Sequence, residues 1–130
     1  MALLLLGLVG CASPDPAAVA DRFDWPDRWD LVLETEDRDR SCGEVLCPTV
    51  IRYYRAADEP AQVCEDAAAA LGTDTSVHAR GCTLDRCVDD VFVTVSVSDE
   101  GQRVHEGVED RIVEAPTSGA AVAVRARVGC

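Results

Sequence analysis

Hydrophobic and polar positions alternate most regularly in the last third of the chain, and this period of two predicts β-strands. In DVFVTVSVS, residues 90–98, a valine stands at every second position, with threonine and serine on the opposite face. AAVAVRARV, residues 120–128, has the same period, and Arg125 and Arg127 are predicted to face outward. The side chains predicted to face inward are Val91, Val93, Val95, Val97, Val122, Val124, Ala126 and Val128.

The first half of the chain contains two more predicted strands and one predicted helix. Residues 29–34 alternate as a half-buried strand does, and residues 46–56 are rich in branched and aromatic side chains. Residues 59–72 predict a helix because Pro60 suits its first turn and Gly72 suits its C-terminal cap. The predicted buried side chains are Trp29, Leu31 and Leu33 in the strand, and Val63, Cys64, Ala67 and Leu71 in the helix.

One segment between the last two strands is ambiguous. In residues 103–115, Val104, Val108 and Ile112 have helical spacing, whereas RIVEA favours a strand. The order of the remaining elements predicts an α+β fold, a small antiparallel sheet with one packed helix that is stapled by disulfides. The length of roughly 100 residues suits a single domain with a modest core, which we place at residues 29–130.

The segment before this domain, residues 11–28, is predicted to be a flexible tether. Its prolines, aspartates and small residues bury too little apolar surface to become ordered. Trp25 and Trp29 stand four residues apart near its end. We favour the interpretation that they dock the tether onto the domain; the alternative is an exposed binding patch.

The chain starts with an apolar run that ends abruptly at a cysteine. This run, residues 2–9, is shorter than the roughly 20 residues that a membrane-spanning helix needs. It suits the apolar part of a signal peptide, which is followed by small residues at a cleavage site. The sequence LVGC at residues 8–11 resembles the lipobox of bacterial lipoproteins, so residues 1–10 are expected to be the signal peptide.

The resemblance implies that Cys11 receives a diacylglyceryl group and becomes the first residue of the mature chain. The membrane is then a partner through the lipid on Cys11. In this family Asp directly after the cysteine favours the inner membrane, so Ala12 implies the outer membrane of a cell that has one. The family's signal peptides start with Lys or Arg, and none precedes the leucines here, so we expect the reading frame to extend upstream of Met1.

The number of cysteines agrees with export. There are seven, and setting Cys11 aside leaves an even number for disulfides in an oxidising compartment. We predict three bridges, with each C-x4-C pair closed on itself and the last strand tied to the helix. The predicted pairs are Cys42–Cys47, Cys82–Cys87 and Cys64–Cys130.

The charge excludes one class of partner. The formal net charge is −12 at pH 7, so the chain is repelled by nucleic acid phosphates and by anionic lipid headgroups. Every basic residue is an arginine, and the acids are scattered among the arginines, as on a solvated surface. We therefore expect no nucleic acid partner, while a protein or other envelope component remains a candidate partner.

The sequence RYYR at residues 52–55 is the most suggestive binding surface. Adjacent tyrosines on a strand point to opposite faces, so one is expected in the core and one beside arginine at the surface. An alternative is that Arg52 pairs across strands with Glu34 or Glu36. The full candidate surface is Trp25, Trp29, Arg52, Tyr53, Tyr54 and Arg55.

Residues for catalysis and metal binding are scarce. The two histidines, His78 and His105, are expected at the surface, and no catalytic or phosphate-loop motif is present. The loop DRDRS at residues 37–41 departs from the calcium-loop pattern and leaves only an irregular Ca²⁺ site open. We therefore expect no cofactor and no metal, and we favour a non-enzymatic binding or structural lipoprotein. The alternative is a small exported hydrolase or lyase using His105 with nearby carboxylates.

Overall fold

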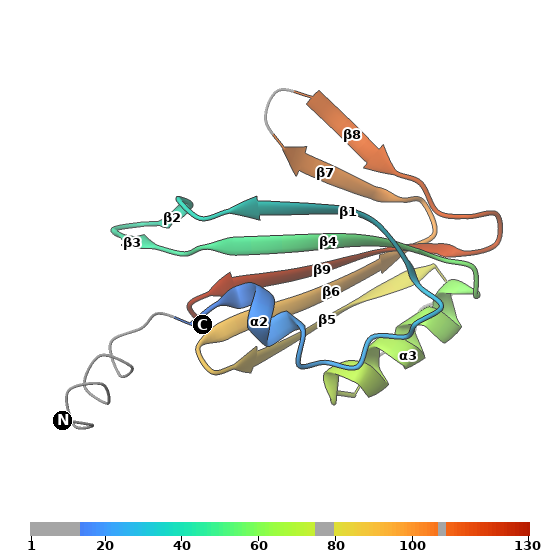
Figure 1. Cartoon of the computed structure of the whole chain (residues 1–130). Coiled ribbons are helices and arrows are strands. Elements are labelled where there is room, and N and C mark those ends of the chain that lie inside the picture. Colours follow the sequence, from blue (N-terminus) through green and yellow to red (C-terminus); the bar gives the residue numbers. More distant parts are fainter. Residues whose placement is uncertain (1–13, 75–79, 107–108) are drawn as a thin grey trace.

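A five-stranded antiparallel sheet forms the centre of the molecule (Figure 1). The computed structural model describes residues 14–74, 80–106 and 109–130. The strands of the sheet lie in the order β1-β4-β9-β6-β5. Their bounds are Asp30–Asp37 for β1, Thr49–Ala56 for β4, Ala120–Val128 for β9, Val91–Ser98 for β6 and Gly81–Val88 for β5. The prediction of an α+β fold with a small antiparallel sheet and one main helix is confirmed.

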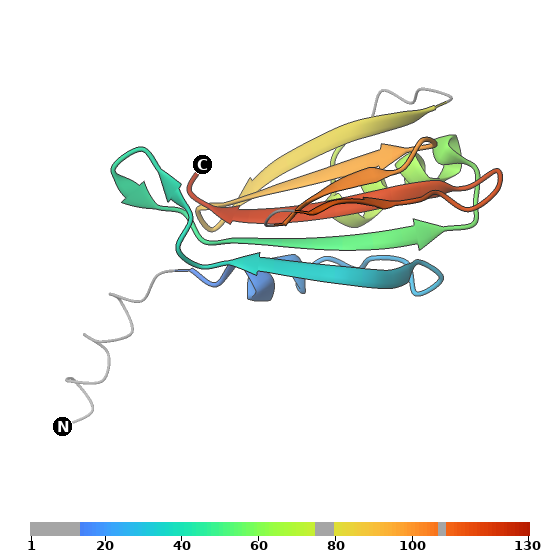
Figure 2. The ribbon, with the colours of Figure 1, turned by 90° about the horizontal axis from the view of Figure 1, so that it is seen from above.

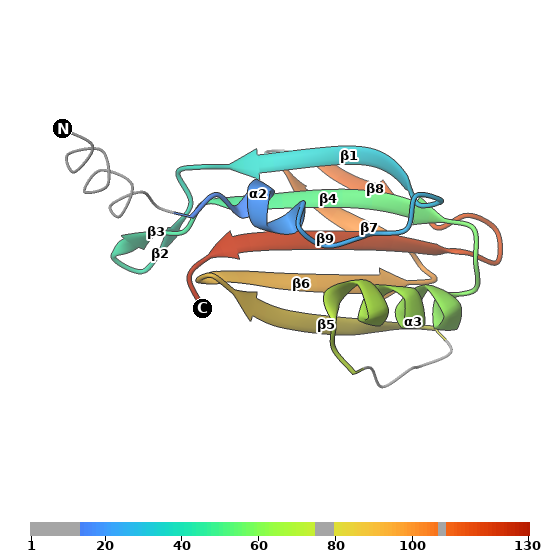
Figure 3. The ribbon, with the colours of Figure 1, turned by 60° about the horizontal axis from the view of Figure 1, so that its bottom comes forward.

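Two helices cover one face of this sheet, as Figure 3 shows. The longer one is α3 (Pro60–Leu71), and the shorter one is α2 (Pro16–Ala20). Helix α3 ends as predicted, because Gly72 has φ 74° and its N–H bonds to the carbonyl of Ala68. All four side chains predicted for its buried face are buried.

The alternation predicted for β6 and β9 is confirmed. The four valines of β6 are 0–3% exposed, and Val122, Val124 and Ala126 of β9 are equally buried against the helices. Val128 is half-buried at the strand end. Because β6 pairs with β9 over its whole length, these side chains form one apolar layer.

The ambiguous segment forms a hairpin of β7 (Gln102–Glu106) and β8 (Glu109–Val113). It lies on the face of the sheet opposite the helices (Figure 1). Val104 is 1% exposed, and Gln102 Nε2 donates to the carbonyl oxygens of Ser96 and Ala121 at 3.0 and 3.1 Å. The helical interpretation of this segment is therefore wrong, and both faces of the sheet are partly covered.

A second hairpin extends the sheet beyond β1 and β4. It consists of β2 (Ser41–Cys42) and β3 (Val45–Leu46), which pair antiparallel. Viewed from above in Figure 2, it projects from the end of the sheet near the C-terminus.

The predicted alternation in β1 is wrong at its start. The register between β1 and β4 shifts between Leu31 and Leu33, as at a β-bulge. The extra residue breaks the period of two, so Leu31 is 53% exposed and Leu33 only half-buried. Trp29, which precedes the strand, is 5% exposed and belongs to the core.

Residues 14–28, predicted to lie in a flexible tether, pack on the domain. Asp15 caps α2 by accepting a hydrogen bond from the N–H of Ala17 at 3.0 Å, and Pro16 occupies the first turn. Val19 and Ala20 are 2% and 1% exposed within the core. Phe23 and Trp25 also pack against the core, so the segment has an apolar contact surface that its composition did not indicate.

Three disulfides are present, as predicted, but only one predicted pair is correct, and the predicted Cys64–Cys130 bridge is wrong because each of these cysteines pairs with a residue of β5. Cys42 pairs with Cys47, whereas the other two bridges are Cys64–Cys82 and Cys87–Cys130. The predicted Cys82–Cys87 bridge is wrong because both residues lie on β5. Five residues of extended strand separate their Cα atoms by about 16 Å, well beyond the reach of a disulfide.

Candidate functional site

The surface predicted around RYYR is not assembled. Tyr53 and Tyr54 do point to opposite faces, yet they are 2% and 9% exposed. Both are buried because elements pack on both faces of the sheet, and burial raises the pKa of Tyr54. The expectation of one exposed tyrosine is therefore wrong.

The two tryptophans also belong to the packing of the domain. The rings of Trp25 and Trp29 are stacked with centroids 6.2 Å apart, and Trp29 contacts Tyr54. Trp25 is half-buried, and its Nε1 donates to the carbonyl of Ala20 at 3.1 Å. These contacts agree with docking of the preceding segment, and they leave Trp29 without an exposed face.

The arginines of RYYR have structural partners. Arg52 forms ion pairs with Asp21 and with Glu34, whose Oε2 lies 3.4 Å from its Nε, so the cross-strand interpretation is confirmed. Burial lowers the pKa of Arg52, but the hydrogen bond and charge of Asp21 and the charge of Glu34 outweigh this and raise it. Arg55 is exposed and donates from Nε to the carbonyl of Glu114 at 3.1 Å.

A different group of arginines lies on the face of the sheet opposite the helices. Arg125 and Arg127 stand two residues apart on β9, so their side chains share this face. Arg40, between β1 and β2, is close enough to act electrostatically on Arg125. We call these three residues the arginine cluster.

None of the residues directly opposite Arg125 and Arg127 on the neighbouring strands carries a carboxylate. Thr94 of β6 and Ile51 of β4 flank Arg125, while Phe92 and Thr49 flank Arg127 in the same way. The guanidinium carbon of Arg127 lies 5.5 Å from the centroid of the Phe92 ring, a cation–π contact.

The cluster lacks the carboxylate partners that several other arginines have. Among the described residues, none of its three guanidinium groups forms an ion pair with a carboxylate. Five arginines elsewhere do so, namely Arg22, Arg28, Arg38, Arg52 and Arg80. Burial lowers the pKa of Arg125, and the positive charges of Arg40 and Arg127 lower it further, while Tyr53 has a smaller opposite effect.

Two atoms of the cluster are buried without a partner. The Nε atoms of Arg125 and Arg127 form no hydrogen bond within the described structure. Arg127 Nη2 donates to the carbonyl of Gly129 at 3.4 Å, a long and weak bond. Buried donors normally have acceptors, so this arrangement favours an added anionic group.

No known protein family, curated protein or solved structure matches this chain. The function must therefore be inferred from the geometry of the molecule itself. Guanidinium groups present planar pairs of donors that match carboxylate and phosphate oxygens. The arginine cluster is consequently suited to hold one such group, in a chain that is otherwise strongly acidic.

The sequence contained part of this signal. Alternation in VRARV predicts that both arginines share a face, but it does not show which residues of β4 and β6 lie beside them. That depends on strand register, which a single sequence does not specify. The cluster was therefore missed as a candidate site.

Several other predicted residues give no site. Cys11 and His78 lie outside the described residues, and His105 is described only through its backbone pairing with Asp110. In residues 14–74, 80–106 and 109–130, no group of three or more His, Cys, Asp and Glu residues is placed to hold a metal ion. None of the helices in these ranges is long and apolar enough to cross a membrane.

Proposed function

We propose that this protein is a lipid-anchored, non-enzymatic binding domain of the bacterial envelope that holds an anionic group at its arginine cluster. The disulfide pairing of the cysteines supports the lipid anchor. All six cysteines after Cys11 are joined to one another in three disulfides. Cys11 is thus the one cysteine left for lipid, at the position where LVGC resembles a lipobox.

The anchor is tested by changing the cysteine itself. In a bacterial host that processes lipoproteins, Cys11→Ser should abolish labelling by radioactive palmitate and move the protein out of the membrane fraction. The physical reason is that acyl chains supply the membrane affinity, at about 0.8 kcal/mol for each buried CH₂. The matched control is Cys42→Ser with Cys47→Ser, which should keep its label. Unchanged fractionation of Cys11→Ser would refute the anchor.

The binding role is supported by the absence of carboxylate partners in the arginine cluster. Three like charges gathered without a carboxylate repel one another, and burial adds to the cost of keeping Arg125 charged. Residues that destabilise a fold in this way are typical of sites that serve binding. An anionic ligand would relieve the repulsion and supply acceptors for the buried Nε atoms.

This role predicts a response to inorganic phosphate, used as a probe at constant ionic strength. At about ten times its Kd, phosphate should stabilise the protein by about 1.4 kcal/mol, seen as a rise in Tm. Arg125→Gln with Arg127→Gln should remove this rise, while its Tm without phosphate stays equal or increases because repulsion is relieved.

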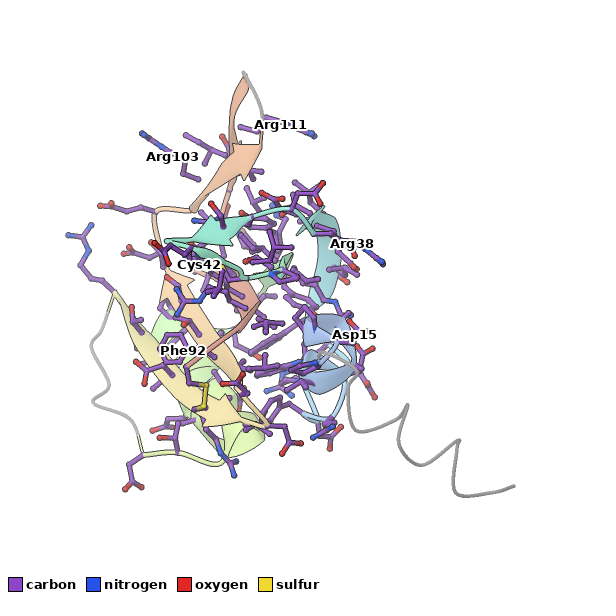
Figure 4. The ribbon with its side chains drawn as sticks, turned by 90° about the vertical axis from the view of Figure 1, so that its left-hand side faces the viewer. Asp15, Arg38, Cys42, Phe92, Arg103 and Arg111 are labelled. Atoms are coloured by element: carbon purple, nitrogen blue, oxygen red, sulfur yellow. A yellow bond between two sulfur atoms is a disulfide. The ribbon has the colours of Figure 1, made fainter. Side chains whose placement is uncertain are left out.

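The control for this experiment is Arg111→Gln. Arg111 is exposed on the separate β7–β8 hairpin (Figure 4), so its loss should leave the phosphate response intact. A phosphate response that persists in Arg125→Gln with Arg127→Gln, or that chloride reproduces, would refute the arginine cluster as the site.

A further inference from the structure

The described chain begins beside the base of hairpin β2–β3. Pro14, Asp15 and Pro16 line one groove together with residues that flank the hairpin, namely Glu36, Arg38, Pro48, Thr49 and Val50. Figure 4 views this end of the molecule and shows Asp15, Arg38 and Cys42 on it. Cys11 is three residues before Pro14, so its Cα lies at most about 11 Å from that of Pro14. A lipid on Cys11 therefore holds this end of the domain close to the membrane.

The hairpin that projects here is unusually apolar at its surface. Val45 and Leu46 are 64% and 65% exposed, the highest values among the exposed large hydrophobic side chains of the described residues. Because they are adjacent on β3, they point to opposite sides of the hairpin. Both sides of the tip are thus free of the domain.

The shape of the hairpin is fixed by bonds at its base. The Cys42–Cys47 disulfide joins its two arms, and the N–H of Cys47 donates to the carbonyl of Arg40 at 2.7 Å. A two-stranded hairpin alone is marginally stable in water, so these bonds hold the apolar tip in an extended position. Leu46 lies opposite Ser41 and Val45 opposite Cys42, so Gly43 and Glu44 form the turn. The turn lies about three residues, or roughly 10 Å, beyond the Arg40–Cys47 hydrogen bond, which is close to the reach of the segment that leads to Cys11.

We propose that Val45 and Leu46 enter the interface of the bilayer that holds the acyl chains of Cys11, and so fix the orientation of the domain on the membrane. This inference rests on the lipid anchor of the proposed function. The occupant is a lipid surface because the anchor brings that surface to the tip. The contact is made by the exposed side chains of Val45 and Leu46, and electrostatic attraction does not contribute, because the one charged residue between Ser41 and Leu46 is the acidic Glu44 in the turn.

The test uses the chain from Cys11 onward, which keeps every described residue. Its single free thiol, Cys11, is coupled to a maleimide phospholipid in phosphatidylcholine vesicles, so the experiment does not depend on processing in a cell. The variant Leu46→Trp adds a third tryptophan to Trp25 and Trp29, and its fluorescence is measured. We expect the fluorescence of this added tryptophan to be quenched in vesicles of brominated phosphatidylcholine.

The matched control is Ile112→Trp, whose position is 60% exposed on β8 beside Val32 and Leu33, away from the hairpin. Its added emission should be unaffected by bromine. Emission of Leu46→Trp that survives in brominated vesicles, or equal loss in both variants, would overturn the proposed orientation alone. Loss of the anchor itself would instead be revealed by the absence of palmitate on Cys11. Both substitutions lie at exposed positions, and an unchanged Tm shows that each variant is folded.

Discussion

Replacing Cys87 and Cys130 by alanine should lower the free energy of unfolding by about 4 kcal/mol. This bridge spans 43 residues of sequence and joins the edge strand β5 to Cys130, which follows the end of β9. Without it the unfolded chain gains the entropy of a long open loop. The measurement is urea denaturation of the oxidised proteins, in which the midpoint should fall.

The short Cys42–Cys47 bridge provides the comparison. It spans five residues and lies at the exposed hairpin, so its removal should cost about 2 kcal/mol on the same argument. An equal or larger loss from the short bridge would contradict the loop-length explanation. It would also show that hairpin β2–β3 contributes more to the fold than its exposure indicates.

Elements whose signals lie within their own sequence were predicted well. Strand β6 carries a valine at every second position, and α3 has Pro60 at its start and Gly72 in the left-handed conformation at its end. These features depend on local backbone geometry and on the burial of one face of each element against the apolar core. The same sequence therefore predicted both the elements and their buried faces.

Strand β5 was missed because it lies at the edge of the sheet. Leu84 is its one buried side chain, and Thr83 and Asp85 beside it are exposed. An edge strand has a neighbour on one side only and tolerates polar residues, so its hydrophobic period is weak. Missing β5 led directly to the wrong disulfides, because CTLDRC was interpreted as a loop that could close on itself.

The site was less predictable than the fold. The period of two correctly separated Tyr53 from Tyr54, but it did not show that elements pack on both faces of the sheet. It also placed Arg125 and Arg127 together, yet their significance arises from the uncharged residues beside them on β4 and β6. Both properties depend on contacts between segments distant in sequence.

The burial of Trp29 leads to the second large expected effect. Trp29→Ala should lower the free energy of unfolding by about 3–5 kcal/mol, because it empties a space in the core between Trp25 and Tyr54. Leu31→Ala should change it by less than about 0.5 kcal/mol, since that side chain is 53% exposed. In a regular strand both residues would lie on the same buried face, and both variants would lose stability. Urea denaturation of the two variants therefore distinguishes the bulged register from a regular strand.

A conservative change at Trp29 distinguishes packing from hydrogen bonding. Its Nε1 is buried without a hydrogen-bond partner in the described structure, so Trp29→Phe removes an unsatisfied donor while keeping an aromatic ring. This variant should therefore lose much less stability than Trp29→Ala. If Trp29→Phe and Trp29→Ala were equally unstable, the stability would depend on a hydrogen bond from the indole Nε1 and not on packing of the ring. If both were as stable as the wild type, Trp29 would not belong to the core, and the docking of residues 14–28 on the sheet would lose its main support.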